Sequence, residues 1–202
     1  MNNAQEALSR LKEGNRRFVS GVRSLDTLLS QNRRSEMVTS QTPFAVIIGC
    51  SDSRVPVEMI FDQGLGDLFV IRVAGNIVAP TQIGSVEFAA EQFGTRLVVV
   101  LGHSHCGAIQ ATLDQLRRPM ESQSKNLRSI VERISPAVSG LLNTNLKDDP
   151  AELAHQAMQA NVRMSVNLLK SGSAILEQMV QKDGMLIVGA EYSLETGEVS
   201  FL

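Results

Sequence analysis

Cysteine and histidine are both scarce in this chain of 202 residues. The two cysteines are Cys50 and Cys106, and the three histidines are His103, His105 and His155. Two cysteines cannot build a disulfide framework, and so low a number is typical of proteins from reducing compartments. A chain of this length buries roughly 70% of its unfolded surface on folding, so it needs no disulfide to hold a core.

The chain also lacks an excess of charge of either sign. It carries 19 Lys and Arg against 21 Asp and Glu, a formal net charge of −2. This balance gives no electrostatic reason to expect nucleic acid or an anionic membrane as the main partner. A small uncharged substrate, by contrast, needs no steering field.

Long apolar runs are absent as well. No window reaches 18 consecutive apolar residues, and the first 18 residues, MNNAQEALSRLKEGNRRF, contain no apolar segment typical of a secretory signal. We therefore predict a cytoplasmic protein. A periplasmic location would follow if a signal peptide had been removed from the sequence.

What the sequence does contain is an alternation of strand and helix patterns. Four short runs rich in β-branched residues predict buried parallel strands at 44–49, 68–73, 96–102 and 185–192. Helical periodicity falls at 4–19, 81–94, 106–117, 124–143 and 151–182, with a break near 171–172. Alternation of this kind predicts an α/β fold with a mainly parallel β-sheet flanked by helices. The tail, 194–202, predicts a short antiparallel C-terminal edge strand.

Two polar motifs directly follow predicted strands. Cys50-Ser-Asp-Ser-Arg54 comes after 44–49, and His103-Ser-His-Cys-Gly107 comes after 96–102. In open α/β sheets, ligands bind beyond the carboxyl ends of the strands, so we expect these two loops to converge on one site.

A metal site is the chemistry that these loops favour. Cys50, His103 and Cys106 form a Cys2His set, which for zinc is a catalytic pattern with the fourth position open. The alternatives are that both cysteines are buried apolar side chains, or that they form a disulfide if their Cα atoms lie within about 7 Å. We expect His105 to point away from the ion and His155 to lie on the surface.

Asp52 and Arg54 are the second informative pair, since they can form a charge-assisted, bidentate ion pair within the first loop. Such a pair can simply brace the loop. Beside zinc it has a mechanism, because a free Asp52 carboxylate could fill the fourth position, whereas an Asp52 held by Arg54 leaves it open.

An open zinc position lowers the pKa of bound water toward 7 and provides a hydroxide nucleophile. Because two thiolates neutralise much of the charge of the ion, we expect activity on the alkaline side. The apolar residues near the motifs, Phe69, Val73, Ala74 and Phe88, either belong to the core or form a pocket for a small uncharged electrophile.

The sequence resembles the β-class carbonic anhydrases over essentially its whole length. The motifs that carry the resemblance are Cys50-Ser-Asp-Ser-Arg-Val-Pro56, Arg72-Val-Ala-Gly-Asn76 and Gly102-His-Ser-His-Cys-Gly107, in the order and spacing of the family. The resemblance implies a single domain of this class over 1–202, with an N-terminal helical arm over about 1–40. It also implies a dimer or tetramer in which the N-terminal helix packs on a neighbouring subunit.

The implied activity is reversible hydration of CO2 to bicarbonate and a proton by a zinc-bound hydroxide, with one Zn2+ per chain. Cys50, His103 and Cys106 are the implied zinc ligands. Asp52 and Arg54 are the implied catalytic dyad, with Asp52 as a fourth ligand only in a closed form.

Details of the pattern indicate the plant-type, non-allosteric subclass. Gln41 lies nine residues before Cys50, where that subclass has a glutamine that contacts substrate, and Ile47 replaces the tryptophan of the allosteric subclass. Ala74 and Phe88 stand where plant-type enzymes have valine and tyrosine, which keeps the pocket apolar. The implied substrate-binding residues are Gln41, Phe69, Ala74, Phe88 and Gly107.

Two other functions remain compatible with the sequence. The same hydroxide could hydrolyse a CO2 isostere such as carbonyl sulfide or carbon disulfide. The chain could instead be a non-catalytic, zinc-stabilised member of the family.

Overall fold

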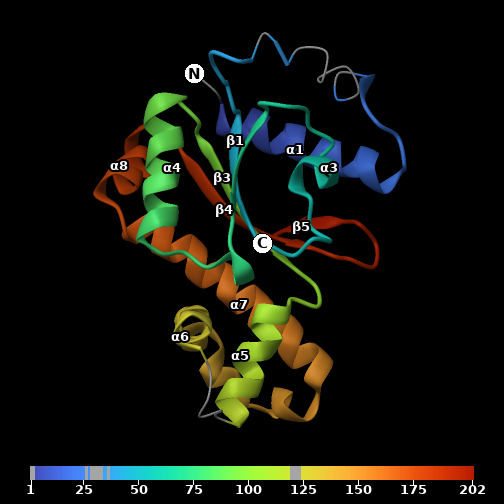
Figure 1. The fold of residues 1–202 in the computed structure, drawn as a ribbon, viewed down its shortest axis with the longest axis vertical. Helices are drawn as coiled ribbons and strands as arrows, with labels where there is room; N and C mark the ends of the chain where they lie inside the picture. The colour runs from blue at the N-terminus through green and yellow to red at the C-terminus, as the bar shows by residue number, and fades with distance from the viewer. Residues whose placement is uncertain (1–2, 26, 28–33, 36, 119–123) are drawn as a thin grey trace.

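A computed structural model describes residues 3–25, 27, 34–35, 37–118 and 124–202 (Figure 1). Its strands form one sheet in the order β2–β1–β3–β4–β5. All neighbouring strands are parallel except β4 and β5, which pair antiparallel at the edge. The strands are β1 (Ala45–Gly49), β2 (Leu68–Arg72), β3 (Leu97–His103), β4 (Leu186–Tyr192) and β5 (Val199–Phe201). The predicted fold class, including the short antiparallel edge strand, is confirmed.

The helices agree closely with the periodicity of the sequence. They are α1 (Ala4–Val19), α3 (Val57–Ile60), α4 (Pro80–Gln92), α5 (Gly107–Arg117), α6 (Lys125–Val138), α7 (Pro150–Ser171) and α8 (Ala174–Lys182), with 3-10 turns η2 (Ala74–Asn76), η3 (Ser139–Asn143) and η4 (Asn145–Asp148). The break expected near 171–172 separates α7 from α8, where the Ser173 hydroxyl caps α8 by accepting from the Leu176 N–H. The sequence did not predict α3, η2 or η4, because three or four residues are too few to show a helical period.

The sheet is buried on both faces. In β1, Val46 and Ile48 pack on one face with α4, α7 and α8, while Ala45 and Ile47 pack on the other face with α1 and α3 (Figure 1). All four side chains are fully buried. Each buried Val or Ile contributes roughly 1.5–3 kcal/mol. A strand with two buried faces has no polar alternation, which is why the runs in the sequence are continuously apolar.

Helix α1 lies against the sheet of its own chain. Its apolar side packs Ala4, Ala7 and Leu11 into the core beside α3. Buried Asn15 fastens its second half, donating to the carbonyls of Ile60 and Gly197 and accepting from the Val199 N–H. The packing of this helix on a neighbouring subunit, which the resemblance implied, stays a prediction. The rest of the predicted arm, over about 1–40, lies partly outside the described residues.

Close packing of α7 against β3 fixes the end of that strand. A Cβ atom on Gly102 would lie 2.6 Å from both Met158 Sδ and Val162 Cγ2. Only glycine at position 102 therefore allows α7 to pack this closely against β3, directly before His103. Among the described residues, no helix is both long enough and apolar enough to cross a membrane.

Asp62, between α3 and β2, ties the segment after α1 to the body of the protein. Its side chain is fully buried and accepts from Arg17 Nε at 2.6 Å, Arg23 Nε at 2.8 Å and the Ser24 N–H at 3.0 Å. Burial raises the pKa of Asp62, but the hydrogen bonds from Arg17, Ser24 and Arg23 outweigh it and the net pKa is lowered.

We expect Asp62→Asn to lower the free energy of unfolding at pH 7 by about 2–3 kcal/mol. This is somewhat less than the cost of breaking a fully buried ion pair, because both arginines are partly exposed. A carboxyl whose folded pKa is lowered stabilises the fold above its unfolded pKa, about 3.9, and loses that contribution as pH falls through the folded value. The difference between variant and wild type should therefore shrink below about pH 4 in urea titrations. Asp148→Asn, at an exposed aspartate, is the control. A pH-independent difference would contradict the assignment.

Candidate metal centre

Three buried side chains meet where β1 and β3 end. Cys50 follows β1, His103 is the last residue of β3, and Cys106 immediately precedes α5. Parallel pairing of β1 with β3 places Gly49 opposite Leu101, so the loops that follow the two strands leave the sheet at the same edge. One ligand atom from each of the three side chains lies within 4.8 Å of the other two.

The His103 ring is oriented for metal binding. Its Nδ1 donates to the Ser104 carbonyl at 2.8 Å, which leaves the lone pair on Nε2. Nε2 is buried and has no hydrogen-bond partner. A buried nitrogen without a partner is costly in a native fold unless a ligand satisfies it. Two thiols and an imidazole are the soft donors that suit zinc, so the residues present fit this metal.

The two cysteines form no disulfide, and each shifts the pKa of the other. The pKa of Cys50 is lowered to about 4, chiefly by a hydrogen bond from Cys106, with further help from the Gly75 N–H and against the opposing effect of burial. The Cys50 thiolate and burial raise the pKa of Cys106. Because the pKa of Cys106 is raised, a metal that binds both sulfurs must displace the proton of this thiol.

Asp52 and Arg54 form a bidentate ion pair beside this cluster. Arg54 Nε donates to Asp52 Oδ1 at 3.0 Å and Nη2 donates to Oδ2 at 2.8 Å, and the Arg54 N–H also donates to Oδ1. The guanidinium holds the pKa of Asp52 well below its usual range, so the carboxylate is ionised at neutral pH. Asp52 Oδ2 lies 4.0 Å from His103 Nε2, beyond hydrogen-bonding distance.

Arg72 is a positioning residue that sequence reasoning missed. From the end of β2, its Nε donates to the Cys50 carbonyl at 2.9 Å and its Nη2 to the Asp52 carbonyl at 2.5 Å. These bonds fix the main chain of the loop that carries both side chains. The available signal was the position of the Arg72-Val-Ala-Gly-Asn76 motif directly after an apolar strand, which we read only as a mark of the family.

Gly75 supports the cluster from the same motif. Its N–H lies 3.4 Å from Cys50 Sγ, and its φ of 69° is in the left-handed region that favours glycine. A Cβ here would lie 2.9 Å from Ile134 Cδ1 and 3.0 Å from Ala108 Cβ. Asn161 of α7 donates to the Gly75 carbonyl at 2.8 Å, so α7 helps to hold the donor in place.

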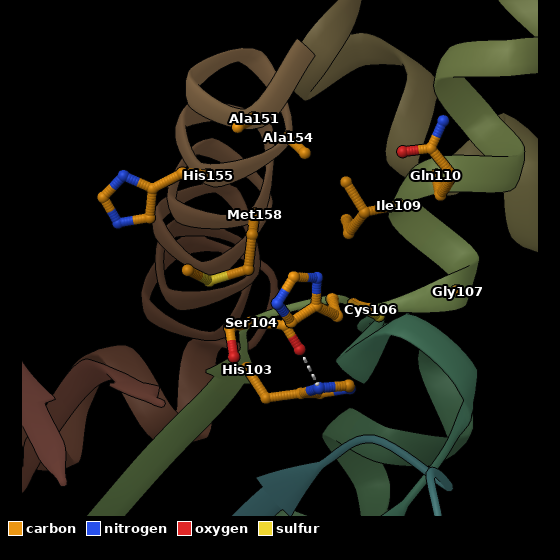
Figure 2. A pocket seen from close by; sticks show the side chains of 11 residues that line it. His103, Ser104, Cys106, Gly107, Ile109, Gln110, Ala151, Ala154, His155 and Met158 are labelled. Carbon is orange, nitrogen blue, oxygen red and sulfur yellow. Dashed lines mark hydrogen bonds between the residues drawn. The ribbon is translucent and has the colours of Figure 1, made fainter. Parts of the chain in front are cut away.

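A cavity of about 460 Å³ borders the centre. Figure 2 shows Ala151 and Ala154 of α7 facing Ile109 and Gln110 of α5, with His103 at one end. Most of the wall is apolar. The cavity would therefore admit a small uncharged molecule more readily than a charged one.

Of the five predicted substrate-binding residues, Gly107 lines this cavity and the other four do not. Gln41 is exposed, and Ala74 begins η2. Phe69 and Phe88 instead form an aromatic cluster with Phe93, with ring centroids 5.6–6.3 Å apart. β2, which carries Phe69, is an edge strand, and contact of these four residues with a substrate stays a prediction.

The two remaining histidines lie outside the cluster. His105 is exposed, as predicted, and its Nε2 contacts Glu195 Oε1 at 2.5 Å. His155 is half-exposed, lies at the rim of the cavity and contacts Glu191. Neither offers a fourth nitrogen or sulfur to the cluster of Cys50, His103 and Cys106.

Comparison with known proteins gives consistent matches. A family model described as carbonic anhydrase matches residues 45–199. The chain is 39% identical to a carbonic anhydrase of Mycolicibacterium smegmatis over 198 residues, covering 98% of this chain and 92% of that protein. It is 38% identical to carbonic anhydrase 2 of Mycobacterium tuberculosis (strain ATCC 25618 / H37Rv) over 195 residues, covering 96% and 91%. The solved structure of the β-carbonic anhydrase CcaA matches with a TM-score of 0.75 and 27% identity, covering 96% and 94%.

We expect His103→Ala and Cys106→Ser each to reduce the zinc content from one ion per chain to near zero, because three-ligand binding needs every donor. Elemental analysis after dialysis against zinc measures this. His155→Ala, which removes a histidine outside the cluster, should keep the wild-type content. Retention of zinc by both ligand variants would refute the assignment.

Proposed function

Since this chain belongs to the β class of carbonic anhydrases, we propose that it hydrates CO2 reversibly to bicarbonate and a proton, with one zinc ion held by Cys50, His103 and Cys106. The observation that carries this proposal is the buried Cys2His cluster with the unpartnered His103 Nε2, next to a carboxylate held by arginine. When bound, zinc would act as a Lewis acid that lowers the pKa of water toward 7.

The residues of the chain supply orientation. Asp52 is an ionised acceptor and can take a hydrogen bond from the attacking oxygen, which turns a lone pair toward the carbon of CO2. Arg54 prevents Asp52 from swinging away, because two parallel hydrogen bonds fix the plane of the carboxylate. Gly107 begins α5, where free N–H groups favour an oxygen that gains negative charge.

The apolar cavity supports a small uncharged substrate. Ile109, Ala154 and Met158 offer few groups that would bind a charged ester or a peptide. Two thiolates also offset the charge of a divalent ion, so we expect activity to increase toward alkaline pH.

We further propose the open, plant-type form of the site. Asp52 is engaged by Arg54 through both carboxylate oxygens, and Arg54 also donates to the His105 carbonyl at 3.3 Å. Release of Asp52 toward the metal would break a charge-assisted bidentate pair. Ile47, in place of a tryptophan, is consistent with the absence of allosteric closure.

Self-association is part of the proposal, in a dimer or tetramer. Phe88 is 51% exposed and lies in an aromatic cluster with Phe69 of the edge strand β2. Phe88 lies on α4 beside this edge strand, and a partner that covers it would remove its ring from water. We expect sedimentation to give at least a dimer and Phe88→Ser to shift it toward monomer. A monomeric wild type would contradict this.

Stopped-flow CO2 hydration on protein of measured zinc content tests the activity. We expect the rate to increase between about pH 7 and 9, and carbonyl sulfide, tested in parallel, to turn over much more slowly. Faster turnover of carbonyl sulfide would favour the hydrolase. No turnover of either substrate by the zinc-loaded protein would favour a non-catalytic family member.

Arg54→Ala tests the dyad. We expect zinc content to be unchanged and kcat to fall at least about 100-fold, since Asp52 is no longer held in place. Arg117→Ala removes the same charge from an exposed position on α5 and is the matched control. An unchanged rate in Arg54→Ala would show that the ion pair only braces the loop and has no part in catalysis.

A further inference from the structure

The turn between β4 and β5 is fastened to the loop that carries two of the predicted zinc ligands. The Ser104 N–H donates to the Tyr192 carbonyl at 3.0 Å. The Leu194 N–H donates to Ser104 Oγ at 2.9 Å, and this hydroxyl donates in turn to Glu195 Oε2 at 2.8 Å. Residues about 90 positions apart in the chain are therefore joined directly beside His103.

Glu195 is at the centre of these contacts. Its carboxylate accepts from the hydroxyls of Ser104 and Ser193 through Oε2, while His105 Nε2 lies 2.5 Å from Oε1. Two of these three partners belong to the loop between His103 and Cys106. An exposed glutamate thus holds both residues of that loop at once.

The two residues held by Glu195 each present a carbonyl to the centre. The Ser104 carbonyl accepts from His103 Nδ1 at 2.8 Å and so sets the orientation of the ring. The His105 carbonyl accepts from Arg54 Nη2 at 3.3 Å, on the guanidinium that clamps Asp52. One side chain is therefore connected to both halves of the site.

The backbone of His105 makes this support necessary. Its φ is 54°, in the left-handed region that residues other than glycine rarely adopt. Such a conformation persists only where surrounding contacts impose it. The contact between His105 and Glu195 joins this residue to the β4–β5 turn, and loss of this contact would let the loop relax and turn the His105 carbonyl away from Arg54.

We propose that Glu195 is a positioning residue for the metal centre, acting on His103 through Ser104 and on Arg54 through His105. Its roles toward zinc and toward catalysis rest on the proposed function.

A purely structural role in the hairpin would involve other groups. The turn is closed by the Ser193 N–H to the Glu198 carbonyl, the Gly197 N–H to the Ser193 carbonyl and the Thr196 N–H to Ser193 Oγ. The Glu195 side chain is not a partner in any of these three bonds, and its one contact within the turn is to Ser193 Oγ. Loss of Glu195 should therefore leave the hairpin and the thermal stability largely intact.

The test compares Glu195→Ala with Glu198→Ala, an exposed glutamate of the same turn. We expect Glu195→Ala to speed zinc release to a chromogenic chelator and to lower kcat, each by roughly 10- to 100-fold, as outer partners of metal ligands typically do. Glu198→Ala should match the wild type in both. Equal behaviour of the two variants would overturn the proposal.

A glycine rescue tests the mechanism. In a His105→Gly background the left-handed conformation costs nothing, so adding Glu195→Ala should change kcat much less than it does in the wild type. An undiminished effect would overturn the route through His105. Zinc release needs no substrate, so it still tests Glu195 if the wild-type protein fails to hydrate CO2, an outcome that would reject the proposed function alone.

Discussion

The parallel pairing of β1 with β3 is the contact on which the centre depends. Both strands are buried on both faces, so their register is fixed by packing and not by the polar loops that follow them. Since parallel neighbours end at the same edge, Cys50 and His103 leave the sheet side by side. The close approach of α7 at Gly102 then fixes the last residues of β3.

Burial of ionised groups at this edge is compensated locally. A thiolate on Cys50 is stabilised by the Cys106 thiol and by the Gly75 N–H, and Arg72 donates to the carbonyls of Cys50 and Asp52. Asp52 is ionised because Arg54 pairs with both of its oxygens. The one strong polar atom of the cluster left without a partner is His103 Nε2, and that imbalance is what a metal would resolve.

Much of the fold could be read from the sequence because its strands are continuously apolar and its helices are periodic. The break between α7 and α8 was predicted from the helical pattern, and the antiparallel β5 from the turn in the C-terminal tail. The short α3 and η2 were missed, since periodicity needs more than one turn of helix. The pair of Asp52 and Arg54 was predictable because two residues in one loop can meet through local geometry alone.

The sequence by itself determined the chemistry of the site, namely which donors are present and that they follow strands. Residue type and local spacing are properties of the chain, and they suffice for the Cys2His set and the dyad. Only the tertiary structure decided which distant groups support them. Arg72, Asn161 and Glu195 reach the centre from β2, α7 and the β4–β5 turn because strand order and helix packing bring those elements together. The same strand order places Phe69 on the edge strand β2, where it packs against Phe88 of α4, away from the cavity beside His103.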